Sequence, residues 1–358
     1  MVDLSKESIG ATRITAVAGI NPYTAPIDVW SEIFGISAGF SGNEASRLGL
    51  QLEPTVAKDY AMKNNLAFNV DDYVYDGLGN NSYVGSKELL SPTGQLALQP
   101  GDKVWHPDIP YFHCTPDFLI PNADGEITKI LEIKTFGLLS GGRGASEVWG
   151  KEYTDEVPSW YFAQVQWQMY IIGPQIQEVD LHVMVPGFGD KLFYTYTIKR
   201  DDELIEILAQ KGHEFWNENV LKEVAPPTDG SDSYKNYLAD RFPKNNTTVI
   251  NDDGTSYALV QEYKEGKKMM DIGKNIMQEA QNMLKNIIGE NTGIKGDWGL
   301  VSWKNIKDGQ KVDFESAFNH LSQMCDDTNG RQTTKSILEN NTVIKKGYRR
   351  FSISSRGK

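Results

Sequence analysis

The segment from Cys114 to Thr135 constrains the fold of this chain most, because it combines a hairpin pattern with closely spaced charged side chains. Asn122-Ala123-Asp124-Gly125 contains the Asp-Gly pair that is typical of a tight hairpin turn. The run Ile127 to Thr135 that follows is rich in β-branched residues and predicts the returning strand. The segment therefore predicts two antiparallel strands.

Two acids and a lysine fall at defined places on this hairpin. Side chains alternate between the two faces of a strand, so Glu132 and Lys134 are expected on one face, and Leu131 and Ile133 in a core on the other. If the strands pair as the turn predicts, Asp117 lies opposite Glu132. The hairpin thus brings three charged groups together.

Such a set has a known chemical use. Two carboxylates that hold a divalent cation beside a lysine can cleave a phosphodiester, because the cation polarises the phosphoryl oxygen and activates water. We therefore take Asp117 and Glu132 as candidate metal ligands and Lys134 as a candidate catalytic residue. The same residue types are also common in surface turns and on exposed strand faces. Other segments must therefore decide between a catalytic site and an ordinary surface hairpin.

Glu53 is a candidate for binding a second cation or the attacking water. Leu48, Leu52 and Val56 are spaced as on one side of a helix, which puts Glu53 at the helix edge. From spacing alone, a solvated surface glutamate explains this residue at least as well.

The segment Tyr161 to Tyr170 carries three glutamines among large apolar residues of one predicted helix. Gln164 and Gln168 share a face, as do Gln166 and Tyr170, because residues four apart are neighbours on a helix. Half-buried amides need hydrogen-bond partners. A scissile phosphate, a 5′-phosphate or the catalytic lysine would serve, and so would backbone groups in a core.

Thr12 and Arg13 lie at a predicted helix N-terminus, where free backbone amides favour anions. They are candidates for holding a terminal phosphate. A plain helix start explains them equally well.

Composition limits the class of protein. The chain has 358 residues, of which 39% are hydrophobic and 23% charged, enough for two globular domains. No apolar run approaches the roughly 20 residues of a membrane helix, and the first residues lack a secretory signal. Cys114 and Cys325 are the only cysteines, which indicates a reducing cytoplasm and excludes a four-cysteine cluster built by this chain alone. The net charge of −12 is unusual for a nucleic-acid binder, although a metal-dependent nuclease needs basic surface only locally.

The chain is expected to form two units. Residues 1–224 alternate predicted helices and strands as an α/β unit, and residues 225–256, rich in proline and polar residues, are expected to be a linker. Residues 257–358 predict a small α+β accessory domain with a polar helix over about 257–288 and short strands near 298–306 and 347–354.

Taken in order, these segments resemble the YqaJ-type viral recombinases, relatives of the phage lambda alkaline exonuclease within the PD-(D/E)xK nuclease superfamily. The resemblance covers nearly all of residues 9–222. It rests on Ile9 to Thr12, Gly19 to Tyr23, Leu48 to Pro54, Pro116-Asp117 with Glu132 to Thr135, and Tyr161 to Gln166. The ordered set is specific, whereas Pro-Asp with Glu-x-Lys alone is weak.

The resemblance implies an α/β fold with a restriction-endonuclease-like core, in which helices flank a mixed central sheet. It also implies roles for particular residues. Asp117 and Glu132 are expected to bind the cation with the main-chain carbonyl of Ile133, Lys134 to be catalytic, Glu53 to serve a second metal, and Gln164 to lie near the phosphate.

The chain departs from the family where the 5′-phosphate is expected to bind. Thr12 stands where the family has serine, and Arg13 at a site where the family often has aspartate. The arginine usually found before this segment is missing, with Ser5 and Lys6 in its neighbourhood. The candidates for contacting DNA or its 5′-phosphate are Thr12, Arg13, Gln164 and Gln166.

The resemblance implies a Mg²⁺-dependent 5′→3′ exonuclease on linear double-stranded DNA, for which Mn²⁺ is expected to substitute. Such an enzyme leaves 3′ single strands for recombination by strand annealing. The implied partners are DNA ends, further copies in a trimeric or tetrameric ring, and a single-strand annealing protein, in the cytosol of a bacterium or phage-infected host. A site- or structure-specific endonuclease, a non-catalytic DNA-binding assembly protein and a helicase-associated nuclease subunit stay open as alternatives.

Overall fold

The fold is that of a computed structural model, which describes residues 7–37, 42–75, 81–85, 87–141, 144–297 and 299–304, and four single residues beyond. The chain divides into two compact units, Met1–Arg241 and Phe242–Lys358. The first unit extends past the predicted domain end at residue 224 and includes a helix, α7 (Asp232–Arg241), within the stretch expected to be a linker.

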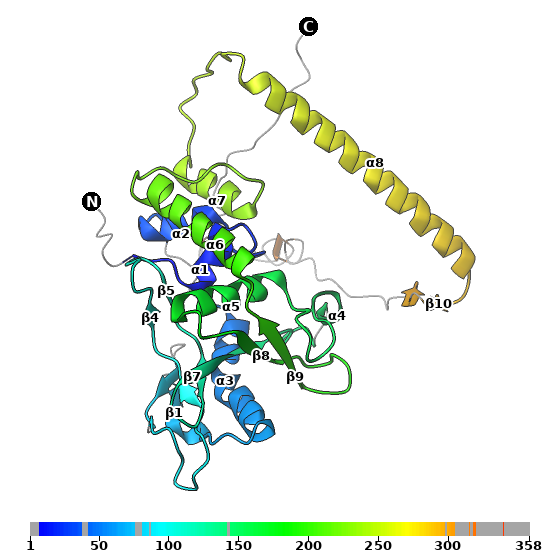
Figure 1. Cartoon of the computed structure of the whole chain (residues 1–358). Coiled ribbons are helices and arrows are strands. Elements are labelled where there is room, and N and C mark those ends of the chain that lie inside the picture. Colours follow the sequence, from blue (N-terminus) through cyan, green and yellow to red (C-terminus); the bar gives the residue numbers. More distant parts are fainter. Residues whose placement is uncertain are drawn as a thin grey trace, which may run out of the picture. The chain divides into compact units, whose positions relative to one another are not determined.

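A five-stranded mixed sheet forms the centre of the first unit (Figure 1). In spatial order its strands are β3 (Gln99–Pro100), β6 (Phe118–Pro121), β7 (Ile127–Thr135), β8 (Glu178–Met184) and β9 (Phe193–Lys199). The β7–β8 pair is parallel and the other three pairs are antiparallel. Two parallel neighbours need a crossover connection, and the chain between them contains α4 (Ala145–Val148) and α5 (Ser159–Ile172). The predicted mixed sheet flanked by helices is confirmed.

The predicted hairpin forms between β6 and β7. Phe118 pairs with Leu131 in an antiparallel register. At the turn, the Asn122 side chain accepts hydrogen bonds from the amides of Asp124 and Glu126 over 2.9 Å each. Gly125 has φ 86°, a conformation that favours glycine. Next to the turn Pro121 pairs with Ile127, and a bulge between Ile120 and Pro121 shifts the pairing to the predicted register at Phe118 and Leu131.

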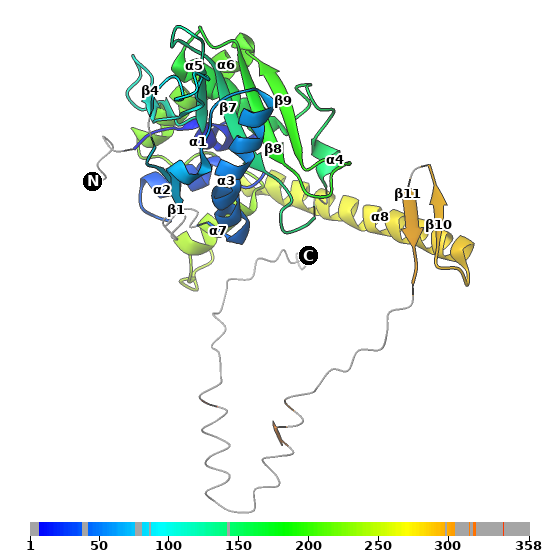
Figure 2. The same ribbon diagram turned by 90° about the horizontal axis from the view of Figure 1, so that it is seen from below.

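Helices α3 (Glu44–Lys63) and α5 cover opposite faces of the sheet (Figures 1 and 2). The side chains of β8 show the division, because Leu181 packs into the core under α5, whereas His182 bonds to Asp59 of α3. Helix α3 runs through Pro54 without a break. Proline in a helix interior removes one hydrogen bond, and three buried neighbours, Val56, Ala57 and Tyr60, anchor the following turn.

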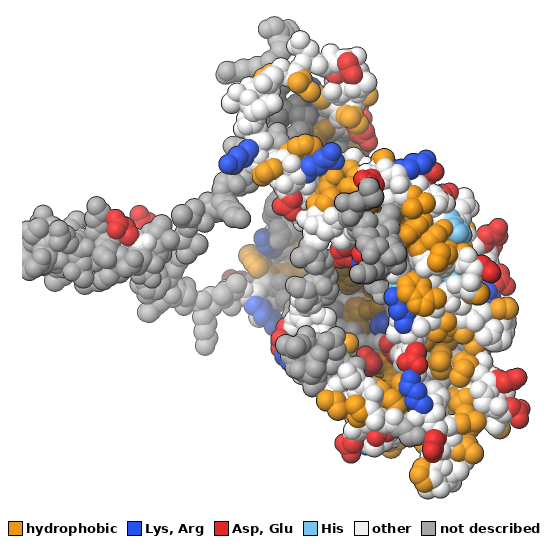
Figure 3. Space-filling model, turned by 90° about the vertical axis from the view of Figure 1, so that its left-hand side faces the viewer, with side chains coloured by type: hydrophobic (Ala, Val, Ile, Leu, Met, Phe, Trp, Pro, Cys, Tyr) orange, Lys and Arg blue, Asp and Glu red, His pale blue; other side chains and the backbone are white. Residues whose placement is uncertain are grey.

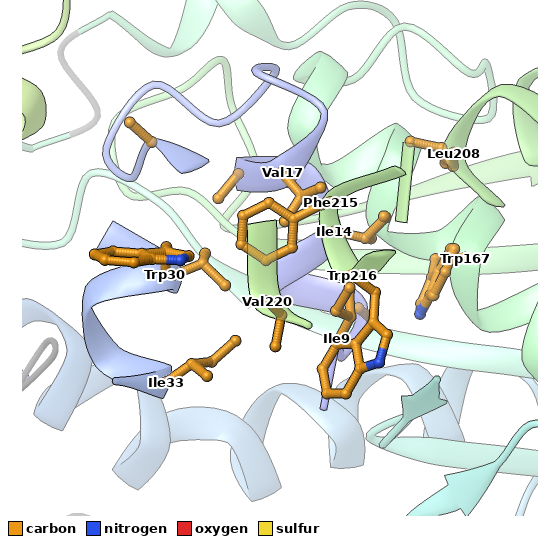
Figure 4. Packing of buried hydrophobic residues seen from close by; sticks show 14 of the residues in the cluster. Ile9, Ile14, Val17, Trp30, Ile33, Trp167, Leu208, Phe215, Trp216 and Val220 are labelled. Atoms are coloured by element: carbon orange, nitrogen blue, oxygen red, sulfur yellow. The ribbon is translucent and has the colours of Figure 1, made fainter. Parts of the chain in front are cut away.

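The N-terminal helices build a separate core against the outer side of α5. Helices α1 (Ala11–Val17), α2 (Pro26–Ile33) and α6 (Asp202–Glu214), with the π-helix η3 (Phe215–Val220), supply most of its side chains. Figure 4 shows Trp167 of α5 beside Leu208 and Ile14, and Trp30 and Ile33 beside Val220. α5 is thus packed on both sides, with Trp167 in the outer core and Val165 and Met169 in the core against the sheet.

Short elements complete the first unit. They are the 3₁₀ turn η2 (Val70–Asp72), the hairpin of β1 (Tyr73–Tyr75) with β2 (Asn81–Tyr83), and the pair β4 (Val104–Trp105) with β5 (His113–Cys114).

The second unit contains the predicted long helix, α8 (Ser256–Ile288), followed by a hairpin of β10 (Gly293–Gly296) and β11 (Gly299–Ser302). The strand predicted near 347–354 lies outside the described residues. Among the helices that the structure describes, none combines the length and apolar character needed to span a bilayer.

Candidate active site

The hairpin places Asp117 beside Glu132. Asp117 directly precedes β6, and its backbone carbonyl accepts a hydrogen bond from the Gly101 amide over 2.9 Å. Its carboxylate Oδ2 accepts a 2.7 Å hydrogen bond from the Ile133 amide. A Cβ at Gly101 would lie 1.9 Å from the Pro116 carbonyl oxygen, so only glycine permits this close approach. Backbone contacts therefore fix Asp117 on both sides.

Glu132 is a buried carboxylate whose two oxygens both accept hydrogen bonds. Only 1% of the residue is exposed. Oε1 accepts from the Lys134 ammonium and, over 2.6 Å, from the Gln164 amide. Oε2 accepts from the Gln168 amide over 2.7 Å. A buried charge is tolerated only when it is paired and hydrogen-bonded, and these three donors meet that need.

Helix α5 supplies two of these donors from one face. Gln164 and Gln168 are four residues apart and both reach Glu132. Tyr161, one turn earlier, packs its ring against Lys134, with the ammonium 5.4 Å from the ring centroid. The lysine is thus held between a carboxylate and an aromatic face.

Glu53 reaches the same group from α3. The helix comes close to β7 at Gly49, where an added Cβ would lie 2.8 Å from the Thr135 hydroxyl oxygen. Burial raises the pKa of Glu53 to about 7; the Lys134 charge opposes this rise, whereas the Glu132 charge adds to it. These influences place the Glu53 carboxyl in the electrostatic environment of both residues.

Asp117, Glu132 and Glu53 form an acidic group around the single ammonium of Lys134. Burial raises the pKa of Asp117 well above its usual range, and Glu132 and Glu53 raise it further, against Lys134 and the Ile133 amide. Burial lowers the pKa of Lys134, but the carboxylates of Glu132 and Asp117 outweigh this, so its pKa lies above the ordinary value. Three carboxyl groups therefore share one ammonium.

The donor chemistry of this group fits a divalent cation. Hard cations such as Mg²⁺ take oxygen ligands and are bound through one or two carboxylates plus substrate. Asp117, Glu132 and Glu53 would hold it, and its charge would offset the repulsion that raises the pKa of Asp117. In the described part of the chain, no three acidic, histidine or cysteine side chains are already arranged as a metal cage. Glu132 instead faces Lys134 and the α5 amides, so cation binding requires side chains to turn.

Gln166 and Arg13, predicted to contact DNA or its 5′-phosphate, make hydrogen bonds within the protein. Gln166 is fully buried, donates to the Lys199 carbonyl over 2.7 Å and accepts from the Asp201 amide over 2.9 Å. Both ends of its amide are paired, so it anchors α5 to the end of β9 rather than to DNA. Arg13 donates to the Ser8 carbonyl over 2.9 Å and pairs with Glu32 over 3.1 Å.

Thr12 is exposed on α1, and none of its contacts places it with Glu132. The Ile133 carbonyl as a ligand stays a prediction, since the observed contact of Ile133 is made by its amide. Gln168 was not among the predicted site residues, although its spacing from Gln164 was the signal that identifies it.

Neither the face shown in Figure 3 nor the cavity between α2 and α7 singles out the site. On the face shown in Figure 3, basic and acidic side chains are interspersed among apolar ones. A cavity of about 640 Å³ between α2 and α7 is lined by Trp30, Tyr237 and Arg241, and by none of the acidic group. The chemistry of the buried side chains is what identifies the candidate site.

Comparison with known proteins gives a family and several relatives. Residues 2–175 match the family described as the YqaJ-like viral recombinase domain. The uncharacterised protein YqaJ of Bacillus subtilis (strain 168) is 25% identical over 287 residues, which are 78% of this chain and 75% of that protein.

Two solved structures are similar to part of the chain. An alkaline exonuclease from Laribacter hongkongensis is 18% identical, with a TM-score of 0.41, over 60% of this chain and 89% of that one. A phage-related exonuclease from Haemophilus somnus 129PT is 14% identical, with a TM-score of 0.38, over 60% of this chain and 96% of that one.

Proposed function

From the match of residues 2–175 to the YqaJ-like viral recombinase domain family, we propose that the chain is a member of this family and a metal-dependent DNA exonuclease. The observation that carries the proposal is the arrangement around Glu132. A nearly unexposed carboxylate receives an ammonium and two amides, with Asp117 beside it and Glu53 acting on it from a third element. A structural core gains nothing from so many acids, whereas phosphodiester hydrolysis uses them with a cation.

Each side chain has a task in this reaction. Asp117 and Glu132 would hold Mg²⁺, with Glu53 at a second position. When bound, the cation supplies charge stabilisation at the phosphoryl oxygens. The Lys134 ammonium donates to Glu132 in the absence of DNA and would turn to donate to a phosphate oxygen when DNA binds. Gln164 and Gln168 keep Glu132 oriented while Lys134 turns.

The direction of cleavage follows from the family resemblance. We propose 5′→3′ degradation of one strand of a linear duplex, leaving a 3′ single strand for annealing. Thr12 remains an exposed hydroxyl for a 5′-phosphate. Arg13 would need to leave Glu32 and Ser8 to assist, so it is the weaker candidate.

Partners follow from the same resemblance. We propose a homo-oligomeric ring around the duplex and a single-strand annealing protein that receives the 3′ strand. Mn²⁺ is expected to replace Mg²⁺, since both take oxygen ligands.

The test is digestion of a linear duplex labelled separately at each 5′ and 3′ end, beside the same DNA as a closed circle, with Mg²⁺ and with chelator. We expect Mg²⁺-dependent loss from the 5′ ends and an intact circle, and no cleavage by Lys134→Ala. Nicking of the circle would replace the exonuclease by an endonuclease. Binding without cleavage of either DNA would replace it by a DNA-binding assembly protein.

A further inference from the structure

Tyr73 is held rigidly at the edge of the acidic group by three aromatic rings. Its ring centroid lies 5.1 Å from that of Tyr83, 5.6 Å from Phe68 and 6.0 Å from Phe118. Phe118 directly follows Asp117 in the chain. The phenol therefore has one fixed direction, set by packing rather than by a hydrogen bond.

The hydroxyl of Tyr73 is buried and has no hydrogen-bond partner among the residues that the structure describes. Burial raises the pKa of Tyr73 above its usual value, and the charges of Glu53 and Asp117 are among the causes that raise it further. Tyr60 gives the contrast on the same side of the sheet, because its buried hydroxyl donates to Asp180 over 2.6 Å. Buried hydroxyls are normally paired, so the Tyr73 hydroxyl calls for a group from outside the chain.

Donor and acceptor chemistry decides what that group is. The phenol offers a hydrogen, and the carboxyl groups of Glu53 and Asp117 only accept when they are ionised, the form in which they hold a cation. A phosphate oxygen also only accepts and would meet two carboxylates without a hydrogen between them. A cation could contact the lone pairs of the phenol oxygen but would leave the hydroxyl hydrogen without an acceptor. A water molecule accepts from the phenol and donates to both carboxylates, so it satisfies all three groups.

We propose that Tyr73 is a further positioning residue of this site, whose hydroxyl holds a water molecule between Glu53 and Asp117. The proposal rests on the proposed function for its role, which is to orient the water that hydrolysis consumes. That reaction joins the water oxygen to phosphorus and breaks one ester bond. One proton of the water ends on the leaving alkoxide and the other on the new phosphate monoester.

The test compares Tyr73→Phe with the wild-type protein and uses Tyr60→Phe as the matched control. The first readout needs no activity: a crystal structure of the metal-free protein should contain a water about 2.8 Å from the Tyr73 oxygen, and the Tyr73→Phe structure should lack it. Thermal melting is the second. Tyr73→Phe removes no protein hydrogen bond and should melt no lower than wild type, whereas Tyr60→Phe should melt lower.

The third readout is cleavage. Tyr73→Phe should lower the single-turnover rate on the order of 100-fold and leave KM within about twofold, because a water rather than DNA loses its contact. The proposal is overturned by a protein partner at the Tyr73 oxygen, by a melting loss equal to that of Tyr60→Phe, or by an unchanged rate. If the wild type cleaves no DNA, the proposed function fails, and the crystal structure and melting still decide whether the Tyr73 hydroxyl holds a water molecule.

Discussion

Gln168 donates a 2.7 Å hydrogen bond to Glu132 from a side chain that is itself completely buried. A fully buried amide is stable only if its partner is equally fixed. The pair therefore ties the position of the candidate catalytic carboxylate to the packing of α5.

Replacing Gln168 by Leu should lower both stability and activity. It leaves one oxygen of a buried carboxylate without its donor, which costs about 1–3 kcal/mol. Urea denaturation should show this loss, and the cleavage rate should fall at least on the order of tenfold as Glu132 reorients. Gln175→Leu, at an exposed glutamine beyond the end of α5, is the control and should change neither. Full activity in Gln168→Leu would show that Glu132 does not depend on this bond.

Asp117→Asn should abolish cleavage without harming the fold. The amide oxygen can still accept the hydrogen bond from the Ile133 amide, while the charge that a cation requires is gone. Burial and the neighbouring Glu132 raise the pKa of Asp117, so removing its charge should leave the melting temperature equal or higher. Assays of cleavage and melting on the same sample check both statements, and cleavage at the wild-type rate would remove Asp117 from the site.

Mg²⁺ should stabilise the wild-type protein in the absence of DNA. A ligand that binds only the native state adds about 2.7 kcal/mol when its concentration is 100 times Kd. The melting temperature should rise with Mg²⁺, fall back on chelation, and stay constant in Asp117→Asn. An equal rise in that variant would mean that the cation binds elsewhere.

Gly49→Ala should lower activity through strain between α3 and β7. The new Cβ would lie 2.8 Å from the Thr135 hydroxyl, so either the Thr135 side chain or the helix that carries Glu53 must shift. Alanine also favours a helix by about 1 kcal/mol over glycine, so stability alone understates the clash. Gly49→Ala with Thr135→Ala removes the opposing oxygen and should restore the rate, in a double-mutant cycle. Additive losses in the double variant would place the cause outside this contact.

His182 should make stability depend on pH. Its ring is completely buried, with Nε2 3.0 Å from Asp59 Oδ2 and Nδ1 2.8 Å from Thr195 Oγ1. Because a carboxylate only accepts, Nε2 carries the hydrogen and Nδ1 accepts from the threonine. Burial lowers the pKa of His182 to about 4, although Asp59 opposes this.

The unfolded chain, with a histidine pKa near 6.5, therefore binds more protons between pH 6.5 and 4. The neutral, buried His182 thereby contributes to the free energy of unfolding. This contribution is complete above pH 6.5 and is lost as the pH falls toward 4, by about 2 kcal/mol between pH 7 and 5. Urea denaturation at several pH values measures the slope, which should be shallower in His182→Gln. An unchanged slope would assign the dependence to other groups.

Patterns within short segments of the sequence predicted the features that depend on neighbouring residues, namely the hairpin and the shared helix face of two glutamines. The Asp-Gly turn and the alternation in Ile127 to Thr135 were sufficient for the hairpin and the meeting of Asp117 with Glu132, whereas the bulge between Ile120 and Pro121 was not predicted. Spacing by four showed that Gln164 and Gln168 share a face of α5.

Tertiary contacts explain what the sequence left open. Arg13 pairs with Glu32, nineteen residues away, and nothing near Arg13 in the sequence indicates this. Gln166 differs from Gln164 only by two positions on α5, and it meets the end of β9 instead of β7. Tyr73 lies in a three-residue strand, too short for any periodicity to place it.

Strand β7 lies between two hydrophobic cores, with Ile130 in the one under α5 and Leu131 and Ile133 in the one under α3. Glu132 and Lys134 come from the same nine residues. A genetic screen for loss of activity would therefore collect apolar positions of β7 together with the charged ones. Only a screen that also measures the amount of folded protein could distinguish substitutions that remove catalytic side chains from those that disrupt the packing of the two cores.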